Sequence, residues 1–221
     1  MKHRSIEYAQ RRHHLVDFTL CKRGIRDPRV LAAMRSVPRE EFVSPELRDV
    51  IYDDCAQSIG SGQTISQPFT VAFMAQAAQL SASDTILEIG TGSGYGAAVL
   101  SQLGATVHSI ERFPELAELA SHRLQALSYA NVKVHVGDGS LGLADYAPFD
   151  AIVVTAGAAA LPAAYRQQLG EGGRIIIPLG KTTTRQQLVR YTRRQDELHV
   201  DNLGTFAFVP LVGRDGWSPE A

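Results

Sequence analysis

Cysteines and long apolar runs are scarce in this sequence, and each scarcity excludes a class of protein. Cys21 and Cys55 are the only cysteines among 221 residues, and neither stands in a CxxC or zinc-ligand spacing, which argues against a disulfide framework and a structural zinc site. No uninterrupted apolar stretch approaches the roughly 20 residues that cross a bilayer, and the N-terminal segment lacks the apolar core of a secretory signal. We therefore expect a soluble, cytoplasmic protein with reduced thiols and no membrane partner.

An excess of charge of one sign is also lacking. The formal net charge of −1 at pH 7 gives no overall attraction to nucleic acid or to anionic lipid. Basic residues gather before residue 30, but aromatic residues do not alternate with them as on a nucleic-acid-binding surface. We interpret them as a solvated helical face and expect no nucleic-acid partner. The histidines lack carboxylates or thiols at metal-ligand spacing, so we expect no metal.

Apolar residues are abundant enough to build a sizeable core. With 44% hydrophobic residues, the chain 1–221 is expected to form one domain without metal or disulfides. Apolar spacing predicts a helix over residues 6–24 and a second, short helix that begins at Asp27-Pro28. Residues 37–67 are irregular, and long loops in compact chains are usually functional. Since Pro68 opens another helix, we expect residues 1–80 to form an N-terminal helical cap with an active-site loop.

Strand and helix patterns then alternate regularly. Such alternation predicts a mostly parallel sheet covered on both faces, an α/β donor-binding core over residues 81–180. Two later strands flank a turn near residue 195 and predict an antiparallel C-terminal ribbon within residues 181–221. The predicted strands are 85–89, 106–110, 132–136, 149–155, 174–178, 187–192 and 198–209, and the predicted core helices are 95–103, 114–127 and 162–169.

The segment TILEIGTGSGYG, residues 85–96, carries the strongest chemical signal. Gly90, Gly92 and Gly94 follow an apolar strand, and their lack of Cβ atoms lets backbone amides approach a ligand closely. Dinucleotide-binding turns read GxGxxG, whereas this turn reads GxGxG and follows a carboxylate, Glu88. A carboxylate repels a diphosphate but suits a cation. We therefore predict a site for S-adenosylmethionine, a nucleoside with a positively charged amino-acid tail.

Two further carboxylates follow the next predicted strands. Glu111 ends the second strand, where an acidic side chain can accept hydrogen bonds from both ribose hydroxyls. Asp138, in the sequence VGDG after the third strand, is expected to hold the adenine amino group. Because the carboxyl ends of parallel strands share one edge of the sheet, these residues should meet Glu88 and the glycines in one pocket.

Collinear motifs over nearly the whole chain closely resemble those of the protein-L-isoaspartate O-methyltransferase family. The donor-site motifs are shared by many methyltransferases, whereas GQTISQP is nearly specific to this family. The matching segments are VLAAMRSVPREEF (30–42), SIGSGQTISQP (58–68), LEIGTGSGYGAAVL (87–100), SIERFPELAELA (109–120), VGDGSLGLADYAPFDAIVVTAGA (136–158), LGEGGRIIIPLG (169–180) and FVPLVG (208–213).

The resemblance implies a Rossmann-like fold with a mostly parallel seven-stranded sheet, and it implies roles for individual residues. The active-site serine would be Ser66. The donor would contact Thr64, Ile65, Ser66, Glu88, Gly90, Thr91, Gly92, Ser93, Gly94, Glu111, Arg112, Asp138 and Gly139, and the acceptor would contact Ile59, Gly62, Gln63, Val209, Pro210 and Leu211. The implied activity is methyl esterification of the free α-carboxylate of L-isoaspartyl residues in damaged proteins or peptides, by a monomer.

The chemistry of that reaction suggests an orienting role for Ser66. A free α-carboxylate has a pKa of roughly 3.5 and is ionised near neutral pH, so it needs no general base. Alignment and exclusion of water should then matter more than proton transfer. A nucleophilic serine would need a nearby base and an elbow such as GxSxG, which does not surround Ser66.

Other functions remain open at this point. The first alternative is a carboxyl methyltransferase dedicated to one biosynthetic peptide or small molecule. An RNA or DNA methyltransferase is favoured only by the basic N-terminal region, and the fourth core strand ends in Thr155-Ala156-Gly157 rather than in a motif for base amines. A nicotinamide-dependent oxidoreductase with an altered glycine turn and a catalytically silent binding module are the remaining hypotheses.

Overall fold

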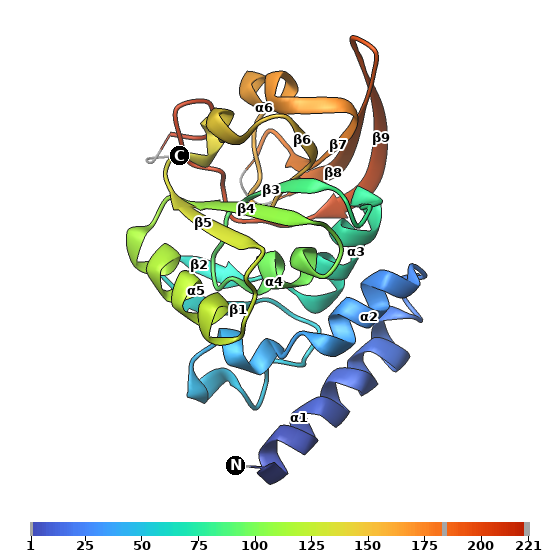
Figure 1. The fold of residues 1–221 in the computed structure, drawn as a ribbon, viewed down its shortest axis with the longest axis vertical. Helices are drawn as coiled ribbons and strands as arrows, with labels where there is room; N and C mark the ends of the chain where they lie inside the picture. The colour runs from blue at the N-terminus through green and yellow to red at the C-terminus, as the bar shows by residue number, and fades with distance from the viewer. Residues whose placement is uncertain (1, 183–184, 219–221) are drawn as a thin grey trace.

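The computed structural model describes residues 2–182 and 185–218, and within them a central sheet is covered by helices on both faces (Figure 1). Its seven strands lie in the order β5-β4-β3-β6-β7-β8-β9. Their bounds are β3 (Thr85–Ile89), β4 (Thr106–Glu111), β5 (Val132–Val136), β6 (Phe149–Val154), β7 (Leu169–Leu179), β8 (Gln186–Arg194) and β9 (Glu197–Phe206).

The strand directions confirm the predicted α/β fold. Strands β5, β4, β3, β6 and β7 run parallel, and β8 and β9 add an antiparallel ribbon at the β7 edge. Most strand bounds lie within two residues of the prediction, and two differ by more. Strand β7 begins at Leu169 and not at Arg174, while β9 ends at Phe206, after which the chain leaves the ribbon and pairs with Gly157.

Helices α3 (Pro68–Ala78), α4 (Tyr95–Ser101) and α5 (Pro114–Ala126) lie on one side of the sheet, and α6 (Ala163–Gln168) lies on the other (Figure 1). Apolar side chains on successive residues of a strand point to opposite faces. In β6, Val153 therefore joins the core under α3 and α4, whereas Ile152 and Val154 join the core under α6. This two-sided burial explains why β6 has a continuous apolar sequence.

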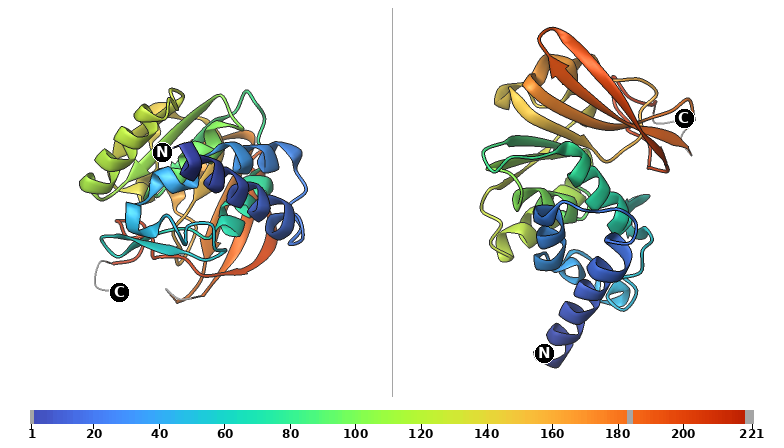
Figure 2. Two further views of the ribbon diagram at one scale, coloured as in Figure 1. Left: turned by 90° about the horizontal axis from the view of Figure 1, so that it is seen from below. Right: turned by 90° about the vertical axis from the view of Figure 1, so that its right-hand side faces the viewer.

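The N-terminal cap packs beside α3 and α4, and the first helix extends away from the rest of the chain (Figure 2). Helix α1 (Lys2–His14) continues as the π-helix η1 (Leu15–Leu20), whose wider turns were not predicted. Helix α2 (Pro28–Ser36) begins as predicted, because Asp27 accepts hydrogen bonds from the backbone N–H groups of Arg29 and Val30 at 2.8 and 3.4 Å.

The segment 37–67 is more regular than predicted. It contains the short 3-10 helices η2 (Arg39–Phe42) and η3 (Pro45–Leu47) and an antiparallel hairpin of β1 (Gln57–Gly60) and β2 (Gln63–Ile65). The hairpin turn needs a left-handed backbone at Ser61, with φ of +51°, and at Gly62, with φ of +67°. Helices η4 (Gly139–Leu141) and η5 (Ala144–Tyr146) are further short 3-10 turns, after β5.

Successive strands are added to the sheet first on one side of β3 and then on the other. The chain moves outward through β4 and β5, then returns to place β6 on the other side of β3. In open α/β sheets this reversal leaves a crevice at the carboxyl ends of the two central strands, where ligands bind. Here that crevice lies between Ile89, at the end of β3, and Val154, at the end of β6.

Candidate active site

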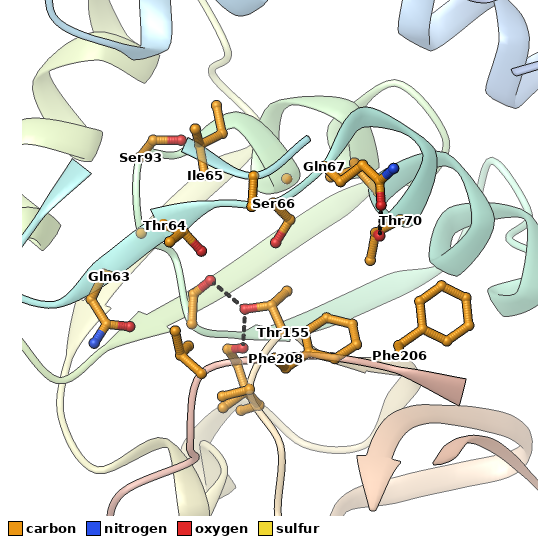
Figure 3. Close-up of a pocket in the computed structure, with 18 of the residues that line it drawn as sticks. Gln63, Thr64, Ile65, Ser66, Gln67, Thr70, Ser93, Thr155, Phe206 and Phe208 are labelled. Atoms are coloured by element: carbon orange, nitrogen blue, oxygen red, sulfur yellow. Dashed lines mark hydrogen bonds between the residues drawn. The ribbon is translucent and has the colours of Figure 1, made fainter. Parts of the chain in front are cut away.

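A cavity of about 800 Å³ lies at the carboxyl ends of β3, β4 and β6. The glycine turn after β3 and the first residues after β4 line one part of it. Segments from outside the parallel core close it: strand β2 with the following residues Ser66 and Gln67, and the chain that leaves β9. Figure 3 shows β2 facing Thr155, Phe206 and Phe208 across this space.

The glycine turn packs directly against the end of β6. Gly90 has φ of +97°, and a Cβ atom there would lie 2.4 Å from the Thr155 hydroxyl, so only glycine fits. The Thr155 Oγ1 lies 2.9 Å from the carbonyl oxygens of both Ile89 and Gly90 (Figure 3). Thr155 thus fixes the turn that sequence reasoning identified, although the sequence did not single out this threonine as a site residue.

Glu111 is held rigidly at the end of β4. It is buried, and its two carboxylate oxygens accept the backbone N–H groups of Gly92 at 2.9 Å and Phe113 at 3.1 Å. Because these hydrogen bonds fix the rotamer, the remaining lone pairs have defined directions within the cavity that Glu111 lines. The predicted pairing of Glu111 with the glycine turn is therefore present as a direct contact.

Glu88 is buried one residue before the end of β3. Burial raises the pKa of Glu88 to about 8, the hydrogen bond from Ser109 opposes the rise, and the nearby Glu111 carboxylate adds to it. The Ser109 hydroxyl lies 2.5 Å from Glu88 and 2.6 Å from the Thr91 hydroxyl. A Cβ atom at Gly96 would come within 2.4 Å of the Glu88 carboxylate, so the glycine leaves room for it. Such a buried carboxylate is suited to bind a cation.

Asp138 lies in a shallower cavity beside the first. The two cavities share Arg112 and Val212 as lining residues. One Asp138 oxygen accepts hydrogen bonds from Ser140, and the other accepts the backbone N–H of Arg214 at 2.8 Å. Partial burial favours a higher pKa for Asp138, but the hydrogen bonds from Arg214 and Ser140 outweigh it and hold the pKa below its usual value. Asp138 therefore lies beside the main cavity but outside its lining.

Ser66 stands between β2 and α3 and lines the main cavity. Its side chain points toward Thr155 in Figure 3. The neighbouring backbone is anchored, because Asp54 accepts the backbone N–H of Phe69 at 3.0 Å and the Asp54 carbonyl accepts the Gln67 side-chain amide at 2.7 Å. The hydroxyl is therefore presented on a fixed turn.

An aromatic wall borders the same cavity on the ribbon side. Phe69 and Phe206 stack with ring centroids 6.5 Å apart, and Phe208 lies 6.3 Å from Phe206. The backbone N–H of Phe208 donates to the buried Gln186 side chain at 2.9 Å, which pins the wall to β8. These phenylalanines were not predicted as site residues, because in the sequence their apolar character cannot be distinguished from that of core residues.

Most predicted site residues meet in the main cavity, and a few do not. The lining includes Gln63, Thr64, Ile65, Ser66, Glu88, Gly90, Thr91, Gly92, Ser93, Glu111, Arg112, Gly139, Val209, Pro210 and Leu211. Four predicted residues lie outside this lining. Gly94 caps α4, Asp138 lies in the adjoining cavity, Ile59 packs beside Gly92, and Gly62 lies in the exposed hairpin turn.

The described residues contain neither a metal-binding cluster nor a membrane-spanning helix. Over residues 2–182 and 185–218, His, Cys, Asp and Glu side chains form no group of three or more that could hold a metal ion. In the same part of the chain, no helix is both long enough and apolar enough to cross a membrane.

Comparisons with known proteins agree with this geometry. A sequence model described as protein-L-isoaspartate(D-aspartate) O-methyltransferase matches residues 10–216. The chain is 53% identical over 204 residues to a protein-L-isoaspartate O-methyltransferase of Protochlamydia amoebophila, covering 92% of this chain and 97% of that one. It is 52% identical over 210 residues to protein-L-isoaspartate O-methyltransferase 1 of Geotalea uraniireducens, covering 95% and 96%.

Solved structures give the same result. A protein-L-isoaspartate O-methyltransferase superposes with a TM-score of 0.82 at 31% identity, covering 93% of this chain and 67% of that chain. A putative protein-L-isoaspartate O-methyltransferase from Plasmodium falciparum, in complex with S-adenosyl-L-homocysteine, superposes with a TM-score of 0.79 at 25% identity, covering 91% and 98%.

Proposed function

Because the chain belongs to the protein-L-isoaspartate(D-aspartate) O-methyltransferase family, we propose that it esterifies the free α-carboxylate of L-isoaspartyl residues in damaged proteins and peptides. S-adenosylmethionine is the methyl donor. The observation that carries the proposal is that Ser66, from the GQTISQP segment, lines the same cavity as the donor turn and Glu111. A donor and an acceptor can therefore meet in one enclosed space.

The residues present fit this donor. The glycine turn offers backbone groups with no Cβ atoms between them and a ligand, as at Gly92, where φ is +52°. The fixed Glu111 carboxylate is suited to accept ribose hydroxyls, and Glu88 is suited to face the ammonium group. When bound, S-adenosylmethionine supplies an electrophilic sulfonium methyl group, and its transfer to a carboxylate oxygen cancels a positive and a negative charge.

Ser66 acts on the acceptor side. Its hydroxyl donates a hydrogen bond to the acceptor carboxylate and holds one oxygen toward the donor. No proton needs to be removed, because an α-carboxylate with a pKa of roughly 3.5 is already ionised near neutral pH. Closure of the cavity by β2 and by the chain after β9 excludes water, which strengthens the interaction between the opposite charges.

The proposal is tested with two matched peptides that differ only in an isoaspartyl or a normal aspartyl linkage. Incorporation of labelled methyl from S-adenosylmethionine into the isoaspartyl peptide alone is expected. Labelling of neither peptide, with intact binding of S-adenosylhomocysteine, would contradict the isoaspartyl acceptor and favour a dedicated small-molecule or peptide acceptor.

The proposal extends to the setting in which the enzyme acts. Cys21 and Cys55 are both free thiols, which supports the proposal that the enzyme acts in a reducing compartment, the cytoplasm. We propose a monomeric enzyme without a nucleic-acid partner, because donor and acceptor residues all come from one chain. Light scattering and salt-dependent RNA binding assays test these two points.

A further inference from the structure

Arg39 is a fully buried cation that the reaction described above does not use. It begins the 3-10 helix η2, and its side chain has 0% exposure. None of the ion pairs among the described residues includes it. The adjacent carboxylate, Glu40, pairs instead with Arg12 at 3.2 Å and accepts the Tyr52 hydroxyl. An arginine buried without a carboxylate is costly, so its contacts indicate why it is there.

The contacts of Arg39 join three segments around the cavity. Its Nε donates to the Ile51 carbonyl at 2.9 Å, and its Nη2 donates to the Ser66 carbonyl at 2.8 Å. Its guanidinium carbon lies 4.7 Å from the ring centroid of Tyr95, the first residue of α4 after the glycine turn. Nη1 has no hydrogen-bond partner among the described residues, and the face of the Tyr95 ring offsets part of the cost of the buried charge.

We propose that Arg39 is a positioning residue for methyl transfer, which fixes the Ser66–Gln67 peptide group relative to the glycine turn. This inference rests on the proposed role of Ser66. A planar trans peptide directs its C=O and N–H to opposite sides. The bond from Arg39 to the Ser66 carbonyl therefore fixes the plane of this peptide and the direction from which the Ser66 side chain leaves it. Contact between Arg39 and Tyr95 fixes the position of that peptide relative to the glycine turn, which Tyr95 directly follows.

Lysine cannot replace arginine in this arrangement. A guanidinium donates from two nitrogens in a rigid plane and also stacks on an aromatic ring, whereas an ammonium is a single point of charge on a flexible stem. Arg39→Lys keeps the charge but cannot hold Ile51, Ser66 and Tyr95 together. A small displacement of an orienting group is enough to lower the rate of transfer strongly.

The test compares Arg39→Lys with Arg174→Lys, a matched control at the other end of α3. Arg174 also anchors backbone, donating to the carbonyls of Ala78 and Gln79 at 2.8 Å. We expect Arg39→Lys to lower kcat/KM for an isoaspartyl peptide about 10- to 100-fold while the Kd for S-adenosylhomocysteine changes less than about threefold. The control is expected to keep kcat/KM within about twofold, because its site is distant from Ser66.

A double-mutant cycle separates positioning from general stability. If Arg39 acts through Ser66, Arg39→Lys combined with Ser66→Ala loses no more kcat/KM than Ser66→Ala alone. Additive losses, an unchanged kcat/KM in Arg39→Lys, or equal losses in Arg39→Lys and Arg174→Lys would each overturn the proposal. If Arg39→Lys does not fold, Arg39→Met takes its place in the cycle, since it removes the buried charge at similar volume.

One measurement remains decisive even if isoaspartyl peptides prove not to be substrates. Hydrogen exchange of the backbone N–H groups of residues 64–67 reports the position of this turn without any turnover. Faster exchange there in Arg39→Lys than in Arg174→Lys supports positioning by Arg39, and equal exchange overturns it. Failure of the peptide assay in the unaltered protein, by contrast, counts against the proposed function alone.

Discussion

At the residue scale, Ser66 and Glu111 line one cavity from different segments of the chain. Replacing Ser66 should lower turnover and replacing Glu111 should lower donor affinity. Ser66→Ala removes one hydrogen bond to a charged acceptor, worth about 1.5–3 kcal/mol. We expect kcat/KM for an isoaspartyl peptide to fall about 10- to 100-fold, with unchanged affinity for S-adenosylhomocysteine. Glu111→Ala should instead weaken the affinity for S-adenosylhomocysteine. The variant lacks the proposed acceptor for the ribose hydroxyls, and the Gly92 N–H in the glycine turn loses its hydrogen-bond partner.

Peptide kinetics and calorimetry of both variants check this prediction. Ser58→Ala is the control for Ser66, because Ser58 is an exposed serine in β1 of the same hairpin. Full turnover in Ser66→Ala would remove Ser66 from the mechanism. Full affinity for S-adenosylhomocysteine in Glu111→Ala would show that the ribose assignment is wrong.

Glu88 is the buried group through which we expect pH to affect both donor binding and stability. Burial raises its pKa from an ordinary 4.5 to about 8. The folded protein therefore holds a proton that the unfolded chain releases above pH 4.5, so this group's contribution favours folding at low pH and is lost as the pH rises through 8. Glu88→Gln stays neutral and avoids that loss. We expect Glu88→Gln to raise the free energy of unfolding at pH 8 by about 1–2 kcal/mol, with little gain at pH 5.

The affinity for S-adenosylmethionine should rise with pH, whereas the contribution of Glu88 to stability falls. An ammonium group favours the ionised form of Glu88, so S-adenosylmethionine should bind the unaltered protein more tightly as the pH rises toward 8. Glu88→Gln should bind it weakly at every pH. Thermal melts and calorimetry at pH 5 and pH 8 check both effects. An equal stability gain at the two pH values, or a pH-independent affinity in the unaltered protein, would contradict this account.

At the element scale, residues 207–212 form the side of the cavity that follows β9, and their position depends on hydrogen bonds to β8 and to Gly157. Gln186 is buried and accepts the Phe208 N–H at 2.9 Å, and Gly157 exchanges backbone hydrogen bonds with Val209 and Leu211 at 2.8 and 2.7 Å. Gln186→Ala leaves the Phe208 N–H without this partner. We expect KM for an isoaspartyl peptide to rise about 3- to 10-fold, with a smaller effect on S-adenosylhomocysteine binding.

Peptide kinetics together with hydrogen exchange of residues 207–212 check the attachment. Gln187→Ala is the matched control, because the neighbouring Gln187 is exposed and its side chain bonds only the Thr205 hydroxyl among the described residues, at 2.9 Å. If both variants behaved alike, the position of residues 207–212 would not depend on Gln186.

The elements that the sequence predicted well are those whose signal is local. An apolar run with a carboxylate near its end located Glu88, one residue before the end of β3, and Glu111, the last residue of β4. Contacts between distant segments left no such signal. Thr155 meets Gly90 across 65 residues, and Arg39 meets Ser66 across 27. The β1–β2 hairpin was missed because its turn uses Ser61, which is not a typical left-handed residue, beside Gly62.

At the scale of the whole molecule, the cavity lies where three parts of the chain meet. The lining takes Ser66 from the N-terminal segment, Glu111 from the parallel core and Phe208 from the chain after the ribbon. The buried core continues across the same parts, since Met34, Val153 and Leu188 belong to one apolar cluster. A shared core of this kind favours unfolding of all three parts in one cooperative step.

A ligand bound at this junction should therefore stabilise the entire chain. At a concentration of 100 times its Kd, S-adenosylhomocysteine adds about 2.7 kcal/mol by mass action, which corresponds to a rise in Tm of about 5–10 °C for a chain of this size. We expect a single thermal transition that shifts by this amount in the unaltered protein and in Ser66→Ala, but not in Glu111→Ala at the same ligand concentration. Calorimetric scans with and without ligand make the comparison. A separate transition of the N-terminal helices that ignores the ligand would show that the cap folds independently of the cavity it helps to close.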